Sequence, residues 1–510
     1  MLYALSLILV LVGLGYLLLT LALARTKKPL LEDGDEPKRF IFLVPALNEE
    51  LVIGSTVDGL LGACTDQDRV LVIDDGSSDD TAGIVRSRMG DSRVQLFQRT
   101  LPNAKIGKGK ALNDAYRHIR AEVLAEGIDP HDVVLCIVDA DGRLEPSVLE
   151  EVAPYFRDER VGAVQVLVRI RNREKWLNRF QDYEFLLFSS LTQTAREKLG
   201  SVGLGGNGQF TRLAALMELG DDPWSECLTE DLDLGVRLAI NGWLNRFCGE
   251  THVDQQGLTN PRLLIRQRTR WAQGHFQCWK LVPKVLASHL PTVTAFDMCY
   301  YLLAPGLVLL APIMFAAAMV FYVTSVVANP ELWFSPFGLV YSALQYLFTF
   351  APALYMSLKY RRRAGDLSLL RALAMGHLLA LYNYIWYIAE YRALGRILLR
   401  RNGWAKTARA VEEDPSLPKP EGVDPDARVE ADPALEWWRH EAFAPAQPSR
   451  SMPEPVMVGQ PAQATSAALH RRGRPTEYVL RDNYDEMPTV VMPRLLPPVP
   501  PNVRRRPTAT

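Results

Sequence analysis

Residues 133–141 read Val133-Val134-Leu135-Cys136-Ile137-Val138-Asp139-Ala140-Asp141, an apolar run followed by two acids one residue apart. A short apolar run of this composition predicts a buried strand. Comparable runs occur in the same part of the chain, at Arg39–Val44, Val70–Ile73 and Ala163–Val168. Segments with helical spacing separate the first three runs, at 50–61 and 81–88. Strands that alternate with helices indicate a parallel α/β sheet.

Polar residues follow three of these runs at the point where each run ends. They are Asn48 and Glu49 after the first, Asp74-Asp75-Gly76 after the second, and Asp139-Ala140-Asp141 after the third. Ligands of parallel α/β sheets bind beyond the carboxyl ends of the strands. Ordinary turn chemistry explains any one of these motifs alone. Three of them at one edge predict a binding site.

The acids of the third motif have the chemistry of a metal site. Asp139 and Asp141 are hard oxygen donors of the kind that Mg²⁺ and Mn²⁺ prefer. A divalent ion there would bridge a diphosphate and neutralise charge on a leaving group. Lys108, in Gly107-Lys108-Gly109, is a point charge suited to phosphate, or else the lysine of a solvated loop. Together these residues predict a site for a diphosphate-containing ligand.

Three further motifs lie between residues 204 and 271. Thr229-Glu230-Asp231 has the composition of a helix start. Asn207 lies in a glycine-rich segment, 204–210, which is either a turn or a loop that approaches a ligand closely. Gln267-Arg268-Thr269-Arg270-Trp271 combines guanidinium groups for phosphate with an indole face for a sugar ring. The same basic stretch also fits an amphipathic helix on a bilayer surface.

In this order the motifs resemble the inverting family 2 glycosyltransferases. More narrowly, they resemble the membrane-embedded branch with the cellulose, chitin and hyaluronan synthases. The resemblance covers residues ~38–280 well, the membrane part loosely and the last hundred residues not at all. It implies a GT-A domain over 38–285, an α/β fold with a Rossmann-like mixed sheet, and an interfacial helix near 262–285.

The resemblance also implies roles for the residues of these motifs. Asp231 is the expected general base, which removes the proton of the acceptor hydroxyl, with Glu230 and Asp233 as substitutes. Asp139 and Asp141 are the expected ligands of Mg²⁺ or Mn²⁺. The expected donor-binding residues are Glu49, Asp74, Asp75, Lys108 and Asp139. The expected contacts to the acceptor and diphosphate are Asn207, Gln267, Arg268, Arg270 and Trp271.

Several uncharged stretches are long enough to cross a bilayer. Residues 1–24 carry no charge and precede Arg25, Lys27 and Lys28, which predicts a membrane anchor followed by a cytoplasmic domain. More apolar stretches lie at 298–328, 336–358 and 370–393. The basic segments on either side of the last stretch are both expected to be cytoplasmic, so one of the stretches is expected to be re-entrant or interfacial. The Pro-rich tail, 411–510, is expected to be disordered.

Composition narrows the class of partner. A formal net charge of −1 argues against nucleic acid as a partner, and six scattered cysteines fit reduced thiols.

The resulting hypothesis is a multi-pass enzyme of the inner or plasma membrane that extends a β-linked polysaccharide from a UDP-sugar. The alternative is a single transfer to a lipid such as diacylglycerol or a polyprenyl phosphate; a third hypothesis is an inactive nucleotide-sugar sensor. The small number of spans also suggests an export partner or a homo-oligomer.

Overall fold

The computed structural model describes residues 2–25 and 31–400 of the 510-residue chain. The expected disordered tail, 411–510, lies outside the described residues. The described part contains one sheet of eight strands: β1 (Arg39–Ala46), β2 (Arg69–Asp74), β3 (Val94–Gln98), β4 (Val133–Ile137), β5 (Arg143–Leu144), β6 (Val161–Ile170), β7 (Gln209–Arg212) and β8 (Leu244–Gln255). All four runs that the sequence singled out are strands.

The sheet is mixed. Its order is β3-β2-β1-β4-β7-β6-β8-β5, and the first four strands of that order are parallel. β7 then pairs antiparallel with both β4 and β6, and β5 pairs antiparallel with β8. The expectation of a purely parallel sheet therefore holds for one half of it, and the mixed sheet implied by the resemblance is confirmed.

One glycine makes the antiparallel half possible. Gly208 precedes β7 with a φ of +69°, a conformation that side chains rarely adopt. A Cβ at this position would lie 2.5 Å from the Val166 side chain and 2.8 Å from that of Val253. The chain can therefore enter β7 between its neighbours only because residue 208 has no side chain.

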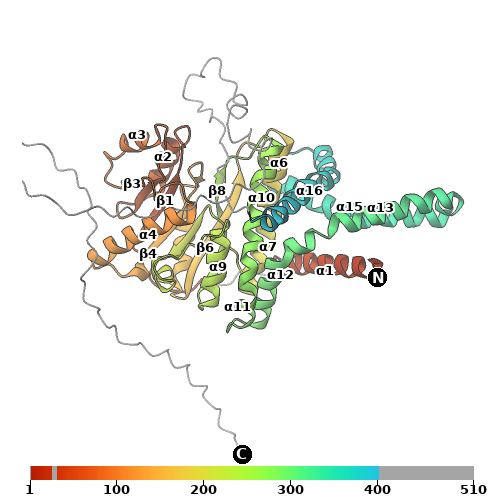
Figure 1. Ribbon diagram of the computed structural model, residues 1–510, viewed down its shortest axis with the longest axis horizontal. Coiled ribbons are helices and arrows are strands. Elements are labelled where there is room, and N and C mark those ends of the chain that lie inside the picture. The colour runs from red at the N-terminus through yellow and green to blue at the C-terminus, as the bar shows by residue number, and fades with distance from the viewer. Residues whose placement is uncertain (1, 26–30, 401–510) are drawn as a thin grey trace, which may run out of the picture. The chain divides into compact units, whose positions relative to one another are not determined.

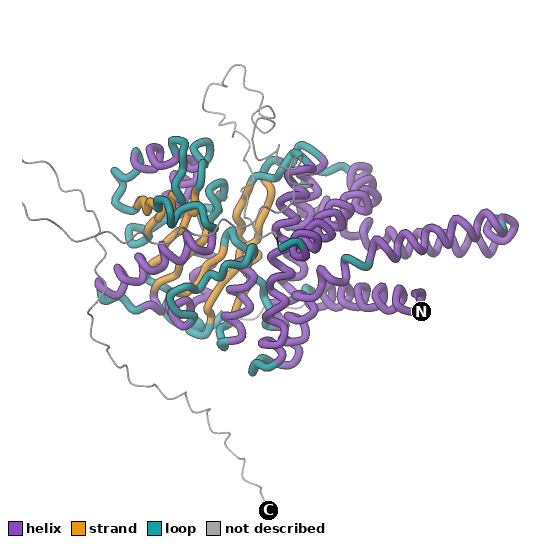
Figure 2. The backbone as a smooth tube through the Cα atoms, in the orientation of Figure 1, coloured by secondary structure: helices purple, strands orange, loops and turns teal. Residues whose placement is uncertain are grey.

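Helices cover both faces of the sheet (Figures 1 and 2). One face packs against α2 (Ile53–Ala63), α3 (Thr81–Arg86) and α5 (Val148–Val152). The other packs against α4 (Lys108–Ala125), α8 (Leu213–Glu218) and α9 (Glu230–Ile240). Alternate residues of β1 point to the two sides, Phe42 to the first and Leu43 to the second, and both are fully buried.

A second group of helices packs beyond the β6–β8 side of the sheet. It contains α6 (Trp176–Tyr183), a π-helical turn η3 (Glu184–Ser189), α7 (Ser190–Leu199), α10 (Pro261–Gln277) and α16 (Leu369–Leu398). The expected helix near 262–285 is α10 followed by η4 (Cys278–Leu281) and α11 (Val282–Leu286). α10 and α16 pack along each other, which brings two segments about a hundred residues apart into contact.

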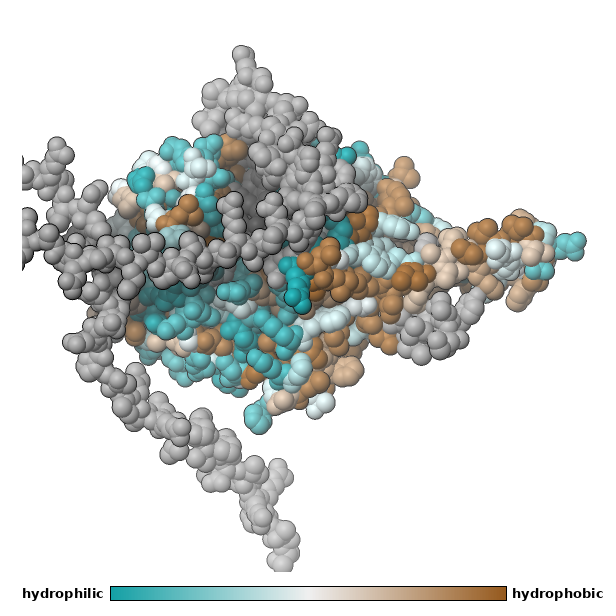
Figure 3. Space-filling model, viewed as in Figure 1, coloured by the Kyte–Doolittle hydropathy of each residue, from teal (hydrophilic) through white to brown (hydrophobic). Residues whose placement is uncertain are grey.

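The remaining helices are apolar: α1 (Leu2–Leu23), α12 (Thr292–Val308), α13 (Ala311–Ala328), the short α14 (Pro330–Trp333) and α15 (Pro336–Ala364). Within the described residues, α13 and α15 are long and apolar enough to cross a membrane, and little of either is buried. Figure 3 shows hydrophobic residues gathered over this pair. The stretch expected at 298–328 is two helices, because Pro312 in the first turn of α13 has no N–H to continue α12.

A buried polar junction joins the first helix to the rest of this unit. Asp297 on α12 accepts hydrogen bonds from the hydroxyls of Tyr16 on α1 (3.1 Å) and Ser201 (2.6 Å). Arg196 on α7 lies 3.2 Å from the same carboxylate and is almost fully buried. α1 and α12 are therefore tied to the helices that border the sheet by polar contacts as well as by apolar packing.

Candidate active site

The three strand-end motifs meet at one edge of the sheet, as the sequence predicts. β1, β2 and β4 are parallel neighbours, so their carboxyl ends share that edge. The loops also contact one another. The Asn48 amide donates to Ser77 Oγ (2.9 Å), and Thr56 Oγ1 donates to the Ala140 carbonyl (2.6 Å).

Asp74 and Glu49 support the loops of this edge. Asp74 is buried; its Oδ1 accepts from the Ser77 amide (2.9 Å) and its Oδ2 from Gln98 Nε2 (3.1 Å). Glu49 is also buried, and its amide donates to Thr81 Oγ1 (2.8 Å). The structure therefore places both residues at the expected edge, where Asp74 holds the turn after β2.

Asp75 anchors the loop that leads towards α4. Its carboxylate pairs with Arg99, which also contacts Asp114 at 2.9 Å, and accepts a hydrogen bond from the Lys105 amide (3.0 Å). Burial raises the pKa of Asp75, although these partners oppose the rise. Asp75, expected to bind the donor, is thus also the residue that fixes the loop ahead of Lys108.

The two acids after β4 are held in different ways. Asp141 is buried, and its Oδ2 accepts from the Gln256 amide (3.0 Å). Asp139 is half-buried; its amide donates to Asn207 Oδ1 (3.1 Å) and its Oδ1 accepts from Lys108 Nζ (2.7 Å). Asn207, expected on the acceptor side, therefore lies against the backbone of the acidic motif.

The donor set of these acids fits a divalent cation shared with a substrate. No group of three or more His, Cys, Asp or Glu side chains suited to a metal occurs among the described residues. Asp139 and Asp141 supply two carboxylates from one loop, and Mg²⁺ is commonly bound by one or two carboxylates plus substrate phosphates. The arrangement suits an ion that arrives with a diphosphate better than a closed protein cage.

Lys108 is the centre of a charged cluster. It begins α4, and its ammonium donates to Asp139 Oδ1 (2.7 Å) and to the Gly206 carbonyl (2.8 Å). Burial lowers the pKa of Lys108, but the carboxylates of Asp139, Glu230 and Asp231 outweigh this and raise it. A side chain at Gly206 would meet Lys108 Nζ at 3.0 Å and Asp231 Oδ2 at 3.2 Å. The glycine-rich loop therefore lets the lysine, the base candidate and the acidic motif converge.

The acids of the Thr229-Glu230-Asp231 motif stand in the first turn of α9. The Thr229 side chain makes no capping hydrogen bond, so capping by Thr229 does not account for the motif. Burial and the Asp231 charge raise the pKa of Glu230 to about 7. Burial also raises the pKa of Asp231, opposed by the hydrogen bond from the Leu232 amide (2.8 Å) and by Lys108. Two coupled carboxyl groups next to a lysine can hold and move a proton.

Asp233, the other acid of this helix, is already paired. It is fully buried, with Oδ1 2.6 Å from Arg237 Nε and Oδ2 3.5 Å from Lys280 Nζ. This arrangement favours a structural role for Asp233.

The Gln267–Trp271 motif lies in the middle of α10. Arg268 is fully buried, and its Nη2 lies 2.6 Å from Glu184 Oε2. Its Nη1 donates a hydrogen bond to Gln267 Oε1 (3.1 Å). Its guanidinium lies over the half-buried Trp271 ring, 4.0 Å from the ring centroid. The Arg270 charge lowers the pKa of Glu230, so Arg270 acts electrostatically on the charged cluster. Of the two arginines expected at the diphosphate, Arg268 is thus paired with Glu184, and Arg270 is the one that acts on the cluster.

Several residues of this region were not singled out from the sequence. Glu184 and Trp386 flank Arg268, and Trp386 Nε1 donates to the second oxygen of Glu184. The thiols of Cys227 and Cys278 lie 3.6 Å apart beside Thr229. Glu184, Trp386 and Cys278 have no spacing signal, because each is brought here by a long-range contact, whereas Cys227 lies two residues before Thr229 in the sequence.

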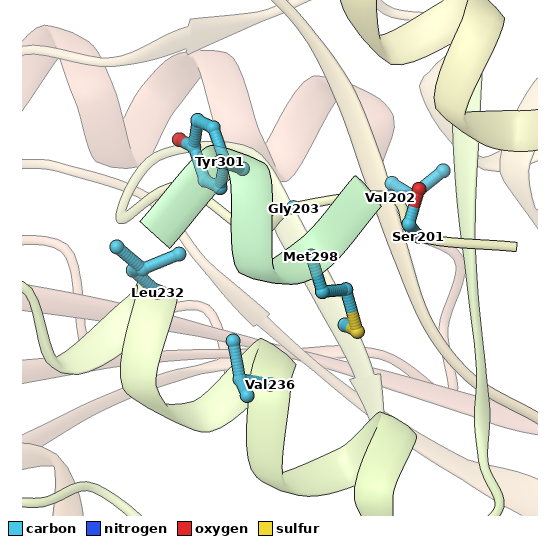
Figure 4. A pocket seen from close by; sticks show the side chains of 7 residues that line it. All are labelled: Ser201, Val202, Gly203, Leu232, Val236, Met298 and Tyr301. Carbon is cyan, nitrogen blue, oxygen red and sulfur yellow. The ribbon is translucent and has the colours of Figure 1, made fainter. Parts of the chain in front are cut away.

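A narrow apolar recess lies behind the base candidate (Figure 4). It is a small cavity of about 10 Å³ between α9, α12 and the loop after α7. Its walls are Ser201, Val202, Gly203, Leu232, Val236, Met298 and Tyr301. Because these walls carry no charged group, the recess is unsuited to a diphosphate, and the charged cluster remains the candidate site for one.

Comparison with known proteins agrees with this geometry. Residues 37–274 match the sequence model of "Glycosyltransferase like family 2". The chain is 34% identical over 270 residues to the beta-monoglucosyldiacylglycerol synthase of Trichormus variabilis, covering 51% of this chain and 54% of that protein. It is 26% identical over 250 residues to the poly-beta-1,6-N-acetyl-D-glucosamine synthase of Staphylococcus aureus, covering 47% and 55%. The chain thus spans about half the length of these relatives.

A solved structure supports the fold. The mannosyltransferase PcManGT from Pyrobaculum calidifontis, solved with GDP-mannose and Mn²⁺, superposes with a TM-score of 0.50 and 19% identity. The alignment covers 79% of this chain and all of that one. Together, the mixed sheet and this likeness show a GT-A-like fold, and residues 37–274 are the part of the chain that resembles the family 2 glycosyltransferases.

Proposed function

We propose that the protein is a membrane-bound inverting glycosyltransferase that moves a hexose from a UDP-sugar to the hydroxyl of a lipid such as diacylglycerol. The observation that carries the proposal is the convergence of Asp139, Glu230 and Asp231 on Lys108 at the carboxyl edge of the sheet. Such a cluster offers groups of both signs, cations for a diphosphate and a carboxylate for a proton. The named activity of the relative at 34% identity supports a lipid acceptor.

In this proposal the cations of the cluster bind the donor. Lys108 and Arg270 would contact the diphosphate, where a lysine acts as a point charge and an arginine as a planar fork. Asp139 and Asp141 would hold Mg²⁺ or Mn²⁺, which when bound supplies positive charge to the leaving diphosphate. Binding of the donor then requires Lys108 to exchange its contact with Asp139 for phosphate oxygens. Glu49, Asp74 and Asp75 would shape the nucleotide side of the same edge.

Asp231 is the proposed general base. Its carboxylate takes the proton of the acceptor hydroxyl while that oxygen bonds to the anomeric carbon. The bond between the sugar and the diphosphate breaks in the same displacement, and its electron pair leaves on the phosphate oxygen. The products are an inverted glycoside and the nucleoside diphosphate, with the proton left on Asp231. Asn207 holds the loop of Asp139, and Gln267 and Trp271 border the acceptor side.

A membrane location agrees with this acceptor. α13 and α15 have the length and composition of membrane spans, and the basic residues after residue 24 favour a cytoplasmic catalytic domain by the positive-inside rule. We therefore propose a multi-pass protein of the inner or plasma membrane.

Extension of a β-linked polysaccharide is a second candidate. It is favoured by the half-buried Trp271 ring in the Gln267–Trp271 motif, which suits stacking on a terminal sugar. The named activity of the relative at 26% identity points the same way. For this candidate, the proposed branch is still the one with the cellulose, chitin and hyaluronan synthases.

The test is a product analysis in membrane vesicles that contain the full-length protein. Vesicles receive radiolabelled UDP-glucose or UDP-N-acetylglucosamine with and without diacylglycerol, and Asp231→Asn vesicles serve as the control. A solvent-extractable product with one sugar per lipid would support the leading proposal. A large, solvent-insoluble product would support the second candidate, and no label above the control would overturn both.

A further inference from the structure

Glu184 joins two helices that are far apart in the chain. Its Oε2 lies 2.6 Å from Arg268 Nη2 on α10, and its Oε1 accepts a hydrogen bond from Trp386 Nε1 on α16. Glu184 begins the π-helical turn η3. π-Helical turns are rare in proteins, and those that occur often lie at functional sites. Both carboxylate oxygens are therefore committed to groups beside the Gln267–Trp271 motif.

Arg268 depends on this carboxylate. It is one of the largest fully buried side chains, and its side chain is 1% exposed. A buried cation without its partner is strongly destabilising, so Arg268 cannot leave Glu184 for a diphosphate without a large penalty. The guanidinium acts instead through its planar face, whose central carbon lies 4.0 Å from the Trp271 ring centroid and 5.1 Å from that of Trp386.

The surroundings of Trp271 show what this contact does. The indole meets the Phe185 ring nearly edge-on at 6.3 Å and the Trp386 ring at 6.5 Å, so aromatic neighbours border it. The guanidinium occupies one side of the ring, and a stacked cation of this kind holds a ring by electrostatic attraction to its π face. The position of Trp271 is thus set by Arg268, and that of Arg268 by Glu184.

We infer that Glu184 is a positioning residue: through Arg268 it fixes the Trp271 ring, and so places the acceptor against Asp231. This inference rests on the proposed transferase function and deepens it on the acceptor side. It assigns Arg268 a role distinct from that of Arg270, whose charge lowers the pKa of Glu230 in the charged cluster. It also makes α16, a helix outside residues 37–274, part of the acceptor site.

Two conservative variants test the inference from both ends of the ion pair. Glu184→Gln keeps an oxygen for Trp386 but removes the charge that Arg268 needs. Arg268→Lys keeps a charge for Glu184 but removes the planar face over Trp271. Each should raise the KM for the acceptor about tenfold, the scale of a lost cation–π contact in a desolvated site. The KM for the UDP-sugar should stay within about twofold of the wild type.

The matched control is Glu197→Gln. The Glu197 carboxylate is also paired with an arginine, Arg246, and accepts a hydrogen bond from the Phe247 amide (2.7 Å). Neither of these partners lies on α10 or α16. This variant should lower the thermal unfolding midpoint and leave the acceptor KM unchanged. If Glu184→Gln and Arg268→Lys behave as this control does, the inference is overturned. If Glu184→Gln fails to fold, Arg268→Lys carries the test.

Failure of the inference is distinguishable from failure of the proposed function. The product made by the wild type decides the function. The ratio of the acceptor KM of each variant to that of the wild type, measured with the acceptor that the wild type uses, decides the role of Glu184. A solved structure of Arg268→Lys gives a readout that needs no activity. A displaced Trp271 ring would support the inference, and an unmoved ring would overturn it.

Discussion

The ammonium of Lys108 lies 2.7 Å from the carboxylate of Asp139, so a cation and an acid of the candidate site are paired with each other. Both side chains are partly exposed, at 20% and 29%. Part of the Lys108 charge is thus already balanced by Asp139. In the proposed reaction, a diphosphate would take over the Lys108 ammonium and a divalent ion would take over the Asp139 carboxylate.

Asp231→Asn should abolish transfer and leave donor binding intact. The amide keeps the shape of the side chain but cannot take a proton, and loss of a general base typically costs about 10²–10⁴-fold. The measurement is the rate of product formation together with UDP binding in the same membranes. Asp233→Asn is the matched control, because Asp233 is paired with Arg237 and should affect stability more than rate. Near-normal transfer by Asp231→Asn would refute its assignment as base.

Glu230→Gln should move the acid limb of the pH–rate profile to lower pH. The Asp231 charge helps to raise the pKa of Glu230 to about 7, and repulsion between two neighbouring carboxylates acts on both of them. Removing the Glu230 charge should therefore lower the pKa of Asp231, which must be ionised to act. The check is kcat/KM against pH for both proteins, and an unshifted limb would show that the two groups titrate independently.

The same substitution has a stability counterpart with a defined sign. The folded-state pKa of Glu230 is raised from 4.5 to about 7. Its contribution to stability is therefore fully present below pH 4.5 and is lost as pH rises through 7. Relative to the wild type, Glu230→Gln should gain stability over that interval. Thermal midpoints measured at its two ends would check this.

Asp141→Asn should weaken donor binding and remove the response to Mg²⁺ or Mn²⁺. The amide oxygen can still accept from the Gln256 amide, so the loop should stay in place while half the carboxylate pair loses its charge. Chelation should silence the wild type, and added metal should restore it. Asp68→Asn is the control, since Asp68 is equally buried but accepts from the Phe40 amide where β1 begins, away from the site. Full wild-type activity in chelator would remove the metal from the proposal.

Trp271→Ala should separate the two candidate functions. If the ring stacks on a terminal sugar, its loss should cost chain extension about 1.5–3 kcal/mol, roughly 10–100-fold. UDP release to water needs no such contact and should fall less, whereas transfer to a lipid should lose only the contribution of Trp271 to placing the acceptor, about tenfold. Trp243→Ala is the control, because Trp243 packs on Gly162 near the start of β6. Small, equal losses in extension and UDP release would favour the lipid acceptor.

The sheet and the order of its motifs were accessible from the sequence because both are written in local patterns. The run before Asp139 predicts β4, and the run before Asp74 predicts β2, since apolar β-formers in short blocks have few other uses. β7 escaped because its four residues are polar in part, and its direction depends on Gly208 rather than on its own composition. The convergence at one edge followed from parallel pairing alone.

The acceptor side could not be predicted in the same way. Arg268 reads as a phosphate ligand from its neighbours in sequence, and only the distant Glu184 shows that its charge is already paired. The role of Asn207 as a partner of the Asp139 amide is likewise set by a contact across 68 residues. Spacing predicts what lies on one strand or helix, whereas these roles depend on which helix packs beside which.

The hydrogen bond between Glu184 and Trp386 spans 202 positions of the chain. Synthesis runs from the N-terminus, so all the motifs between residues 74 and 271 have been made well before residue 386 appears, and α13 and α15 are made in between. Until α16 docks on α10, Arg268 lacks its contact with Trp386. The nascent protein therefore has the residues around Lys108 early and completes the surroundings of Arg268 and Trp271 only when α16 arrives.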